Sequence, residues 1–323
     1  MGKQALRLLT SFHRCARKVR ERGYDYGADM AQTPVKRPTW KEVLAREKLL
    51  QLPAAHDALT ARLIEQAGFP AYQIGGFALC GARFGDPDLD LEQYAEKRAG
   101  VRDIIAASPL PVLVDADDGY GDVKNVTRTV RGYESLGVSA LFIEDQTAPK
   151  RCGHMAGKEV VPAEMHADRI RAAAAARSHP DALFLVARTD ALEARGIEEA
   201  LRRCELYIKA GADAIYVEGP GNRKQLEQIG QSFKGVPKAM DILEGGGETP
   251  WYPPSELKEI GFSMILYPTT VLFRMTYAIQ QALKDLRAGR KMDEGEAVNM
   301  RQFEQIVDMP YWSSVESKFG GGK

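Results

Sequence analysis

The chain has 323 residues, and because Lys plus Arg and Asp plus Glu both number 44, its formal net charge at pH 7 is zero. This balance argues against a nucleic-acid-binding surface, and no apolar run approaches the roughly 18 residues that a membrane helix needs. The apolar fraction of 44% is enough to build a hydrophobic core. We therefore expect a globular protein with neither a nucleic acid nor a membrane as its partner.

The cysteines are few and widely spaced. Cys15, Cys80, Cys152 and Cys204 do not form the pattern of a disulfide framework. We expect free thiols in a reducing compartment, and hence a cytoplasmic location. Cys80 and Cys204 lie among small residues and on a predicted helix, where we expect them to pack.

Residues 1–22 are basic, with seven Lys or Arg and a single acid. An Arg-rich, acid-poor start is typical of a mitochondrial presequence, which would place the protein in the mitochondrial matrix. The same segment could instead form a helix that docks on the main domain. Both interpretations stay open.

From about Trp40 onward, short β-branched runs alternate with longer Ala-, Leu-, Glu- and Arg-rich segments at helical spacing. The pattern predicts eight strands: Leu50–Ala54, Ala71–Gly75, Pro111–Asp115, Ala140–Asp145, Leu183–Thr189, Ala214–Glu218, Pro237–Ile242 and Ser263–Tyr267. It predicts helices between them, among them Asp57–Ala67, Val123–Leu136, Glu164–Arg177, Ile197–Ala210, Arg223–Ser232 and Pro254–Ile260. A glycine, the preferred residue after a helix, directly follows four of these segments: Gly68, Gly137, Gly211 and Gly261.

Eight strands, each followed by helical sequence, predict an α/β fold of the (β/α)8 TIM-barrel type, with a doubly wound open sheet as the main alternative. Polar residues follow many different strands: Asp115 and Asp117, Glu144 and Asp145, Arg188 and Asp190, Glu218, and Asp241. In a barrel all these strand ends meet at one mouth, where active sites lie. We therefore expect a catalytic barrel over residues 41–290, a basic extension over 1–40 and a helical tail over 291–323.

The stretch VDADDGYGD (114–122) places four acids within eight residues at the end of a strand. Asp115 and Asp117 are two residues apart, so on an extended chain their side chains point the same way. Glu144 follows the next strand. Several carboxylates with no histidine suit Mg²⁺, or Mn²⁺ as a substitute, whereas a single acid at a strand end commonly caps the next helix. The sequence therefore predicts a magnesium site.

The segment APKRCGHMAGK (148–158) places Cys152 among Lys150, Arg151 and His154. Positive neighbours lower the pKa of a thiol, and the glycines of the segment give it the freedom of a closing lid. Because the segment follows the fourth strand, it can fold over the metal site. We expect Cys152 to act as a general acid or base, or as a nucleophile.

Together these stretches resemble the isocitrate lyase/phosphoenolpyruvate mutase superfamily over roughly residues 45–290. The matching stretches are VDADDGYGD, FIEDQTAPKRCGH, LVARTDA (185–191), YVEG (216–219) and LYPTT (266–270). KRCGH resembles the signature of the branch that cleaves carbon–carbon bonds, and the chain length is similar to that of its 2-methylisocitrate and 2,3-dimethylmalate lyases. This branch implies a Mg²⁺-dependent retro-aldol split of a 2-hydroxy di- or tricarboxylic acid. The products would be an α-keto acid, pyruvate or glyoxylate, and a carboxylic acid.

The resemblance also implies a role for individual residues. Mg²⁺ would be bound most directly by Asp115, and through water by Asp117, Asp88 and Glu144. The substrate would be contacted by Gly75, Gly76, Phe77, Gly153, Arg188, Asp241 and Thr270, with Arg188 binding a carboxylate. Cys152 would protonate the leaving carbanion, with His154 beside it and Glu218 positioning substrate oxygens. Tyr72 and Glu218 are both candidates for the base that deprotonates the 2-hydroxyl. The family further implies a homotetramer whose C-terminal helices, about 270–315, are exchanged or packed between subunits.

Three positions depart from the family's pattern. The loop after the second strand reads Gly75-Gly76-Phe77 instead of Ser-Gly-Gly or Thr-Gly, Asp241 replaces an Asn, and Met155 replaces the Arg of methylisocitrate lyases. An acid facing a substrate carboxylate costs free energy, and Phe77 adds an apolar wall. We therefore expect a substituted malate, or a 2-hydroxy acid with a neutral or apolar tail, unless Asp241 points away from the substrate.

Two other functions stay open. One is an oxaloacetate-type decarboxylase or acylpyruvate-type hydrolase on the same scaffold, against which the cysteine segment argues. The other is a non-catalytic relative that binds a dicarboxylate, against which the complete set of acids, cysteine and arginine argues.

Overall fold

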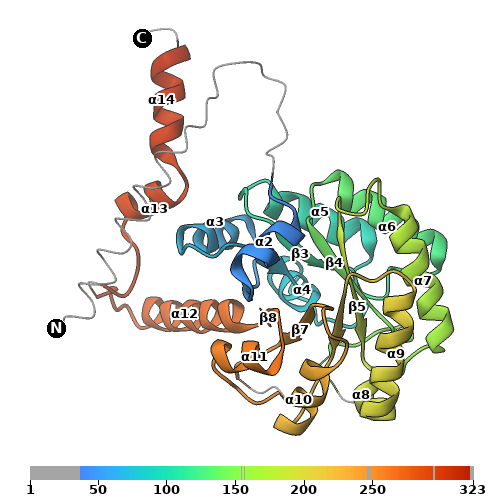
Figure 1. Ribbon diagram of the computed structural model, residues 1–323. Coiled ribbons are helices and arrows are strands. Elements are labelled where there is room, and N and C mark those ends of the chain that lie inside the picture. Colours follow the sequence, from blue (N-terminus) through green and yellow to red (C-terminus); the bar gives the residue numbers. More distant parts are fainter. Residues whose placement is uncertain (1–36, 154, 156, 246–248, 294, 321–323) are drawn as a thin grey trace.

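A computed structural model describes residues 37–153, 155, 157–245, 249–293 and 295–320. Its centre is a parallel eight-stranded sheet (Figure 1). The strands are β1 (Leu50–Pro53), β2 (Tyr72–Ile74), β3 (Val112–Asp115), β4 (Ala140–Glu144), β5 (Phe184–Thr189), β6 (Ala214–Val217), β7 (Lys238–Asp241) and β8 (Met264–Tyr267). β1 pairs with β8, and a parallel bridge between Ala54 and Gln73 joins the β1 end to β2, so the sheet closes on itself. The predicted barrel is confirmed and the open sheet is excluded.

Helices lie outside the strands, the first packing against the inner core and the last leading away from the barrel (Figure 1). They are α2 (Trp40–Glu47), α3 (Ala58–Gln66), α4 (Gly76–Arg83), α5 (Tyr94–Ile105), α6 (Val123–Ser135), α7 (Ala163–Ala176), α8 (Ala191–Arg195), α9 (Ile197–Lys209), α10 (Arg223–Gln231), α11 (Pro254–Ile260) and α12 (Thr270–Arg287). Asp57, Asp122 and Asn222 cap the starts of α3, α6 and α10 with side-chain hydrogen bonds to backbone N–H groups. The glycines expected to follow helices have positive φ values: Gly68, Gly137, Gly211 and Gly261.

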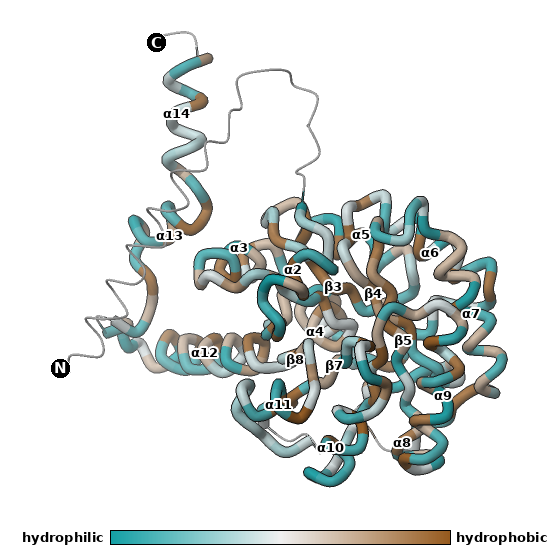
Figure 2. The backbone as a smooth tube through the Cα atoms, in the orientation of Figure 1, coloured by the Kyte–Doolittle hydropathy of each residue, from teal (hydrophilic) through white to brown (hydrophobic). Residues whose placement is uncertain are grey.

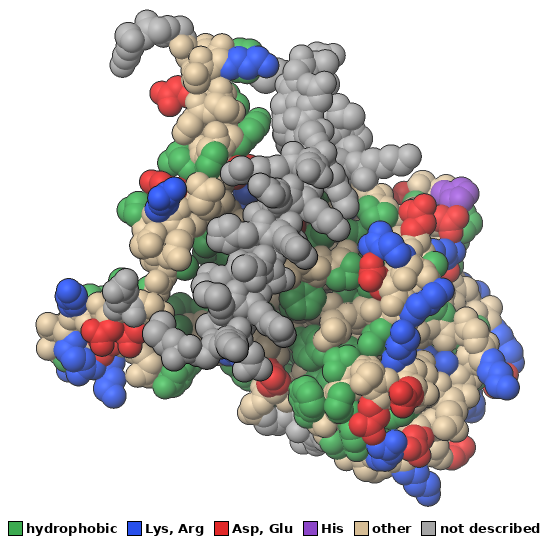
Figure 3. Space-filling model, turned by 60° about the vertical axis from the view of Figure 1, so that its left-hand side comes forward, with side chains coloured by type: hydrophobic (Ala, Val, Ile, Leu, Met, Phe, Trp, Pro, Cys, Tyr) green, Lys and Arg blue, Asp and Glu red, His purple; other side chains and the backbone are tan. Residues whose placement is uncertain are grey.

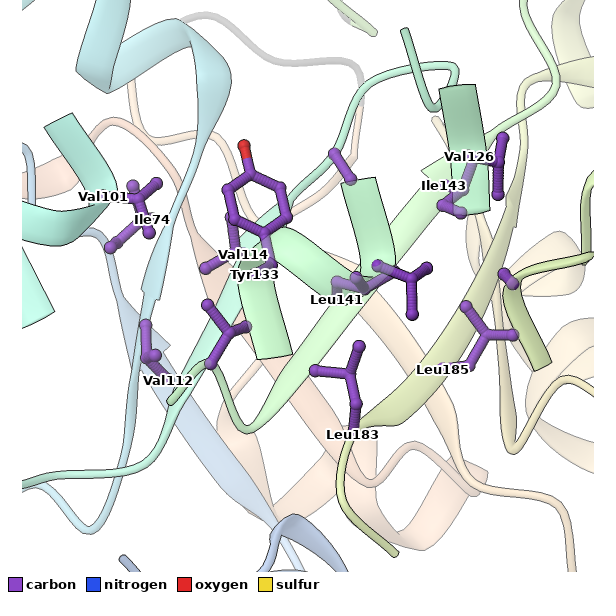
Figure 4. Close-up of a cluster of buried hydrophobic side chains, with 14 of the residues drawn as sticks. Ile74, Val101, Val112, Val114, Val126, Tyr133, Leu141, Ile143, Leu183 and Leu185 are labelled. Carbon is purple, nitrogen blue, oxygen red and sulfur yellow. The ribbon is translucent and has the colours of Figure 1, made fainter. Parts of the chain in front are cut away.

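Successive residues of each strand alternate between two cores. One core lies between the strands and the helices, and the other fills the inside of the barrel. On β3, Val112 and Val114 pack outward against the helices, whereas Leu113 packs inside the barrel. The outer cluster also contains Leu141, Ile143 and Leu185 (Figure 4), and the strands are the most hydrophobic part of the backbone in Figure 2. By the same alternation, the inward position at the end of a strand is polar. It is Asp115 on β3, Glu144 on β4, Arg188 on β5 and Asp241 on β7.

The C-terminal helices form an arm that leaves the barrel. After α12, helices α13 (Met300–Ile306) and α14 (Met309–Phe319) extend away from the sheet (Figure 1). Neither α13 nor α14 has a buried residue. Within the described ranges, no helix is both long and apolar enough to cross a membrane. Residues 1–22, for which the sequence left a presequence or a docking helix open, lie outside the described residues.

Candidate active site

The carboxyl ends of the strands surround a cavity of about 220 Å³. Pockets for drug-sized ligands are typically larger, about 300–1,000 Å³, so this cavity suits a small acid. The sequence-predicted residues that line it are Gly75, Gly76, Phe77, Asp88, Asp115, Glu144, Cys152, Gly153, Arg188, Glu218 and Asp241. The fold therefore gathers most of the predicted site in one place.

Asp115 and Asp117 turn toward each other at the end of β3. Asp117 has a left-handed backbone with φ of 45°, so the chain bends here instead of staying extended as we expected. The Asp117 N–H donates to Asp115 Oδ1 at 3.0 Å, and the Gly76 N–H at the start of α4 donates to Asp115 Oδ2 at 2.9 Å. Burial, followed by the nearby charge of Asp117, raises the pKa of Asp115.

Two buried ammonium groups lie against these acids. Lys150 Nζ is 2.6 Å from both Asp117 Oδ1 and Asp88 Oδ1, and Lys97 Nζ is 2.5 Å from Asp117 Oδ2. Burial alone would raise the pKa of Asp117, but the two lysines outweigh it and lower that pKa below its ordinary value. The sequence named Lys150 only as a positive neighbour of Cys152, and it did not single out Lys97. Lys97 lies on α5, and the packing of this helix buries its side chain.

Arg188, at the end of β5, is held on several sides. Its Nε and Nη2 each donate to Asp190 at 3.0 Å, and its Nε lies 3.3 Å from Glu144 Oε2. Its Nη1 lies 3.6 Å from Glu218 Oε2, and its guanidinium stacks 5.1 Å from the centre of the Tyr216 ring. A guanidinium fixed in this way is pre-organised to bind a carboxylate. The sequence placed Asp190 among the polar strand ends of the mouth without giving it a role, and it did not single out Tyr216.

The carboxylates suit a hydrated divalent cation more than a closed metal centre. In the part of the chain that the structure describes, no three His, Cys, Asp or Glu side chains form a ligand cluster. Mg²⁺ needs only one or two carboxylates and usually keeps several waters. Glu144 Oε1 is buried without a hydrogen-bond partner among the described residues. Burial raises the pKa of Glu144 well above its ordinary value. An unsatisfied, buried carboxylate oxygen beside Asp115 is what a water ligand of Mg²⁺ would satisfy.

The cysteine segment is docked in the mouth and is not an open surface loop. The Cys152 N–H donates to Asp88 O at 3.2 Å. The Gln146 side chain bonds both backbone groups of Arg151, at 3.0 and 2.9 Å. Lys158 Nζ donates to Gly153 O and lies 3.1 Å from a carboxylate oxygen of Glu193. Cys152 is partly exposed, whereas Cys80 and Cys204 are buried as expected. His154 lies outside the described residues.

One wall of the cavity is apolar. Phe77 and Phe273 meet edge to face with ring centres 6.0 Å apart, and Met155 and Leu243 line the same cavity. Phe273 comes from α12, so the arm helix contributes to the site. Asp241, from β7, also lines the cavity, so its side chain does not belong to the outer core.

Three predicted residues occupy less direct positions. Thr269 lines the cavity, whereas Thr270, the next residue and the first of α12, is not among the described lining residues. Asp117 is also absent from the lining and is covered by its lysines. The Tyr72 side chain is buried in the outer core, where burial raises the pKa of its hydroxyl. Of the two candidate bases, Glu218 alone lies at the cavity.

Comparison with known proteins places these residues in a family. The family model for phosphoenolpyruvate phosphomutase matches residues 41–287. The chain belongs to the phosphoenolpyruvate mutase/isocitrate lyase superfamily. The expected superfamily is thus confirmed, and with it the prediction that the chain is an enzyme.

Individual relatives carry different activities. The chain is 39% identical to the chloroplastic carboxyvinyl-carboxyphosphonate phosphorylmutase of Arabidopsis thaliana, over 86% of this chain and 83% of that protein. It is 36% identical to the 2,3-dimethylmalate lyase of Eubacterium barkeri, over 88% and 98%. A solved structure of oxaloacetate acetylhydrolase, bound to 3,3-difluorooxalacetate, superposes with a TM-score of 0.82 at 31% identity, over 87% and 96%. Family membership alone therefore leaves the substrate undecided.

Proposed function

We propose that this chain is a Mg²⁺-dependent carbon–carbon lyase that cleaves a 2-hydroxy acid into an α-keto acid and a carboxylic acid. The observation that carries the proposal is the placement of Cys152 in one cavity with Arg188 and the carboxylates of β3 and β4. A thiol at that position can donate a proton inside the cavity, which a mutase or decarboxylase would not require.

Asp115 would hold the metal, and Asp88, Asp117 and Glu144 would hold its waters. Mg²⁺ bound there would polarise the oxygens of the 2-hydroxy acid and stabilise negative charge as the keto acid forms.

The protein groups divide the remaining work. Arg188 would bind a substrate carboxylate through its Nη1, because Asp190 already occupies Nε and Nη2. Glu218 would accept the proton of the 2-hydroxyl, since it lines the cavity beside Arg188. The electrons of the O–H bond then form the carbonyl, and those of the C2–C3 bond remain on C3. The Cys152 thiol would deliver a proton to that carbon, which balances the proton taken by Glu218.

The walls of the cavity favour a substrate with one apolar end. Phe77, Phe273 and Met155 offer no hydrogen bond to a third carboxylate, and Asp241 would repel one. A substituted malate places its two carboxylates toward Arg188 and the metal acids and its alkyl groups against the phenyl rings. This supports 2,3-dimethylmalate-type substrates over 2-methylisocitrate.

The test is an assay of pyruvate and glyoxylate release with Mg²⁺ across 2,3-dimethylmalate, citramalate, isocitrate, 2-methylisocitrate and oxaloacetate. We expect keto-acid release from a substituted malate, with 2-methylisocitrate slower by about 10²-fold in kcat/KM, the size of discrimination that an apolar pocket typically achieves against an added polar group. Phe77→Ser should open the apolar wall and so reduce the preference in kcat/KM for the substituted malate over 2-methylisocitrate. Turnover of 2-methylisocitrate at a comparable rate would contradict the proposed substrate. Loss of CO₂ from oxaloacetate alone would favour the decarboxylase.

We also propose that the arm of α12–α14 packs against other copies of the chain in a homotetramer. Its exposed apolar side chains are Tyr277, Ile279, Leu283, Leu286, Met300, Phe303, Met309, Trp312 and Phe319, and Figure 3 shows hydrophobic side chains along it. So many large apolar side chains exposed on one arm are uncommon on a monomer.

Light scattering should give four times the 35.7 kDa chain mass. In the double variant Leu286→Asp/Trp312→Asp, the tetramer should dissociate. Leu91→Asp, which changes an exposed leucine away from the arm, should not. A monomeric wild-type protein at micromolar concentration would contradict the proposal.

A further inference from the structure

Gln146 joins the cysteine segment to the body of the barrel. It lies two residues after the end of β4 and is only 1% exposed. Its Oε1 accepts a hydrogen bond from the Arg151 N–H at 3.0 Å, and its Nε2 donates to the Arg151 carbonyl at 2.9 Å. That carbonyl belongs to the peptide bond between Arg151 and Cys152. One side chain therefore holds both backbone groups of the residue that precedes the thiol.

The same amide also contacts the ionic partner of Arg188. Gln146 Nε2 donates to Asp190 Oδ1 at 3.2 Å, and Arg188 Nη2 donates to that same oxygen at 3.0 Å. A short chain of hydrogen bonds thus runs from the backbone beside Cys152, through Gln146 and Asp190, to the guanidinium at the cavity.

Asp190 is the fixed end of this chain. Its N–H donates to Asp145 Oδ1 at 2.9 Å. The other oxygen of Asp145 accepts from Arg203 Nη1 at 2.9 Å and from the Tyr207 hydroxyl at 2.8 Å, both on α9. All four residues are buried. The end of the chain that can move is therefore Arg151, on the cysteine segment.

Satisfying backbone hydrogen bonds does not by itself require Gln146. Arg151 is exposed, so water would satisfy its N–H and carbonyl groups if the segment moved outward. Lys150 and Lys158 also hold the segment through ion pairs, but each does so at the end of a long, flexible side chain. A planar amide that bonds both backbone groups of one residue instead fixes where that backbone lies.

Gln146 is not among the described residues that line the cavity, so it does not contact a substrate there. We infer that Gln146 is a positioning residue that sets the place of the Cys152 thiol relative to Arg188. The inference rests on the proposed function, in which Cys152 donates a proton and Arg188 binds a carboxylate of the same substrate. It adds to that function a residue that acts through the thiol.

The first test measures alkylation of Cys152 by N-ethylmaleimide, followed on its own peptide by mass spectrometry. Gln146→Met keeps the length of the side chain but none of its amide hydrogen bonds. We expect alkylation about tenfold faster in this variant, because the lost hydrogen bonds favour the closed position of the segment. Cys80 and Cys204 are buried, so their alkylation in the same sample reports global unfolding and should not change.

The second test measures kcat for hydroxy-acid cleavage. We expect Gln146→Met to lower kcat by about 10²-fold, the effect that a misplacement of about 1 Å can have. KM should change little, since Arg188 stays bonded to Asp190. In a Cys152→Ser background the same substitution should lower kcat by less than about threefold further, because two changes that act through one group are not additive. A general loss of stability would instead lower kcat in both backgrounds.

Gln225→Met is the matched control. Gln225 Oε1 accepts from the Gly221 N–H at 2.9 Å, so it also joins a glutamine to the backbone of a loop. It lies on α10 and is not among the described lining residues. This variant should keep the wild-type alkylation rate and kcat. If Gln146→Met does not fold, Gln146→Asn keeps the amide, lacks one methylene of reach and should show the same changes.

Unchanged alkylation of Cys152 in a folded Gln146 variant would overturn the inference. Faster alkylation with full kcat, or an equal loss of kcat in the Cys152→Ser background, would do so too. Failure of both variants to fold would show that Gln146 is a structural requirement and would also overturn it. Because alkylation needs no turnover, failure of the proposed function is seen separately. A wild-type protein that releases no keto acid would refute the lyase, while the alkylation rates would still decide whether Gln146 positions Cys152.

Discussion

Replacing Cys152 by serine is expected to lower kcat for hydroxy-acid cleavage by about 10²–10⁴, the usual contribution of a positioned general acid. Serine keeps the size and the backbone hydrogen bond from residue 152 to Asp88 O, but its hydroxyl is a far weaker acid than a thiol. The substrate contacts of Arg188 and the metal acids do not involve the sulfur, so KM and Mn²⁺ affinity should change little. Steady-state kinetics with Mn²⁺ binding in parallel measures both.

Cys204→Ala is the matched control for loss of a thiol. Cys204 is buried on α9, away from the mouth, so this variant should keep its kcat even if its melting temperature falls. If Cys152→Ser retains more than about a tenth of the wild-type kcat, the thiol is not the proton donor. An unchanged rate with oxaloacetate would then support the decarboxylase.

The barrel and its mouth could be predicted because they follow from local rules. Apolar strands with polar inward ends, separated by helices that end before glycines, admit few other folds, and all eight strands appear within two residues of their expected bounds at each end. Position within this frame then placed Asp115, Glu144, Arg188 and Asp241 at the mouth.

What the sequence could not reveal depends on long-range packing. Lys97 resembles any helix-surface lysine until α5 packs against the end of β3. The bend at Asp117 requires a left-handed backbone that a non-glycine residue adopts only in context. The cysteine segment was expected to fold over the metal site, but nothing local shows that Asp88 and Asp117 will bury Lys150. In each case the position of the side chain or segment depends on an ionic partner that is distant in sequence.

Replacing Gly153 by alanine is expected to lower kcat/KM by about 10²-fold or more, since a misplacement of about 1 Å can have that effect in a catalytic site. A Cβ at this position would overlap the Glu218 carboxylate, with its Cδ only 2.6 Å away, and the Arg188 guanidinium. Both groups are buried and fixed by other contacts, so the cysteine segment would have to move instead. Cys152, the adjacent residue, would move with it.

Gly157→Ala separates this steric effect from a general loss of flexibility. Gly157 has φ of +79° and no atom of the described residues within 4 Å of a Cβ, so alanine there adds backbone strain of about 1 kcal/mol but no overlap with them. We expect Gly157→Ala to retain most activity. We expect trypsin to cleave Gly153→Ala faster after Lys150 and Arg151, because the undocked segment exposes both residues. Equal activity and equal proteolysis in the two variants would show that close docking of Gly153 against Arg188 and Glu218 is not needed for catalysis.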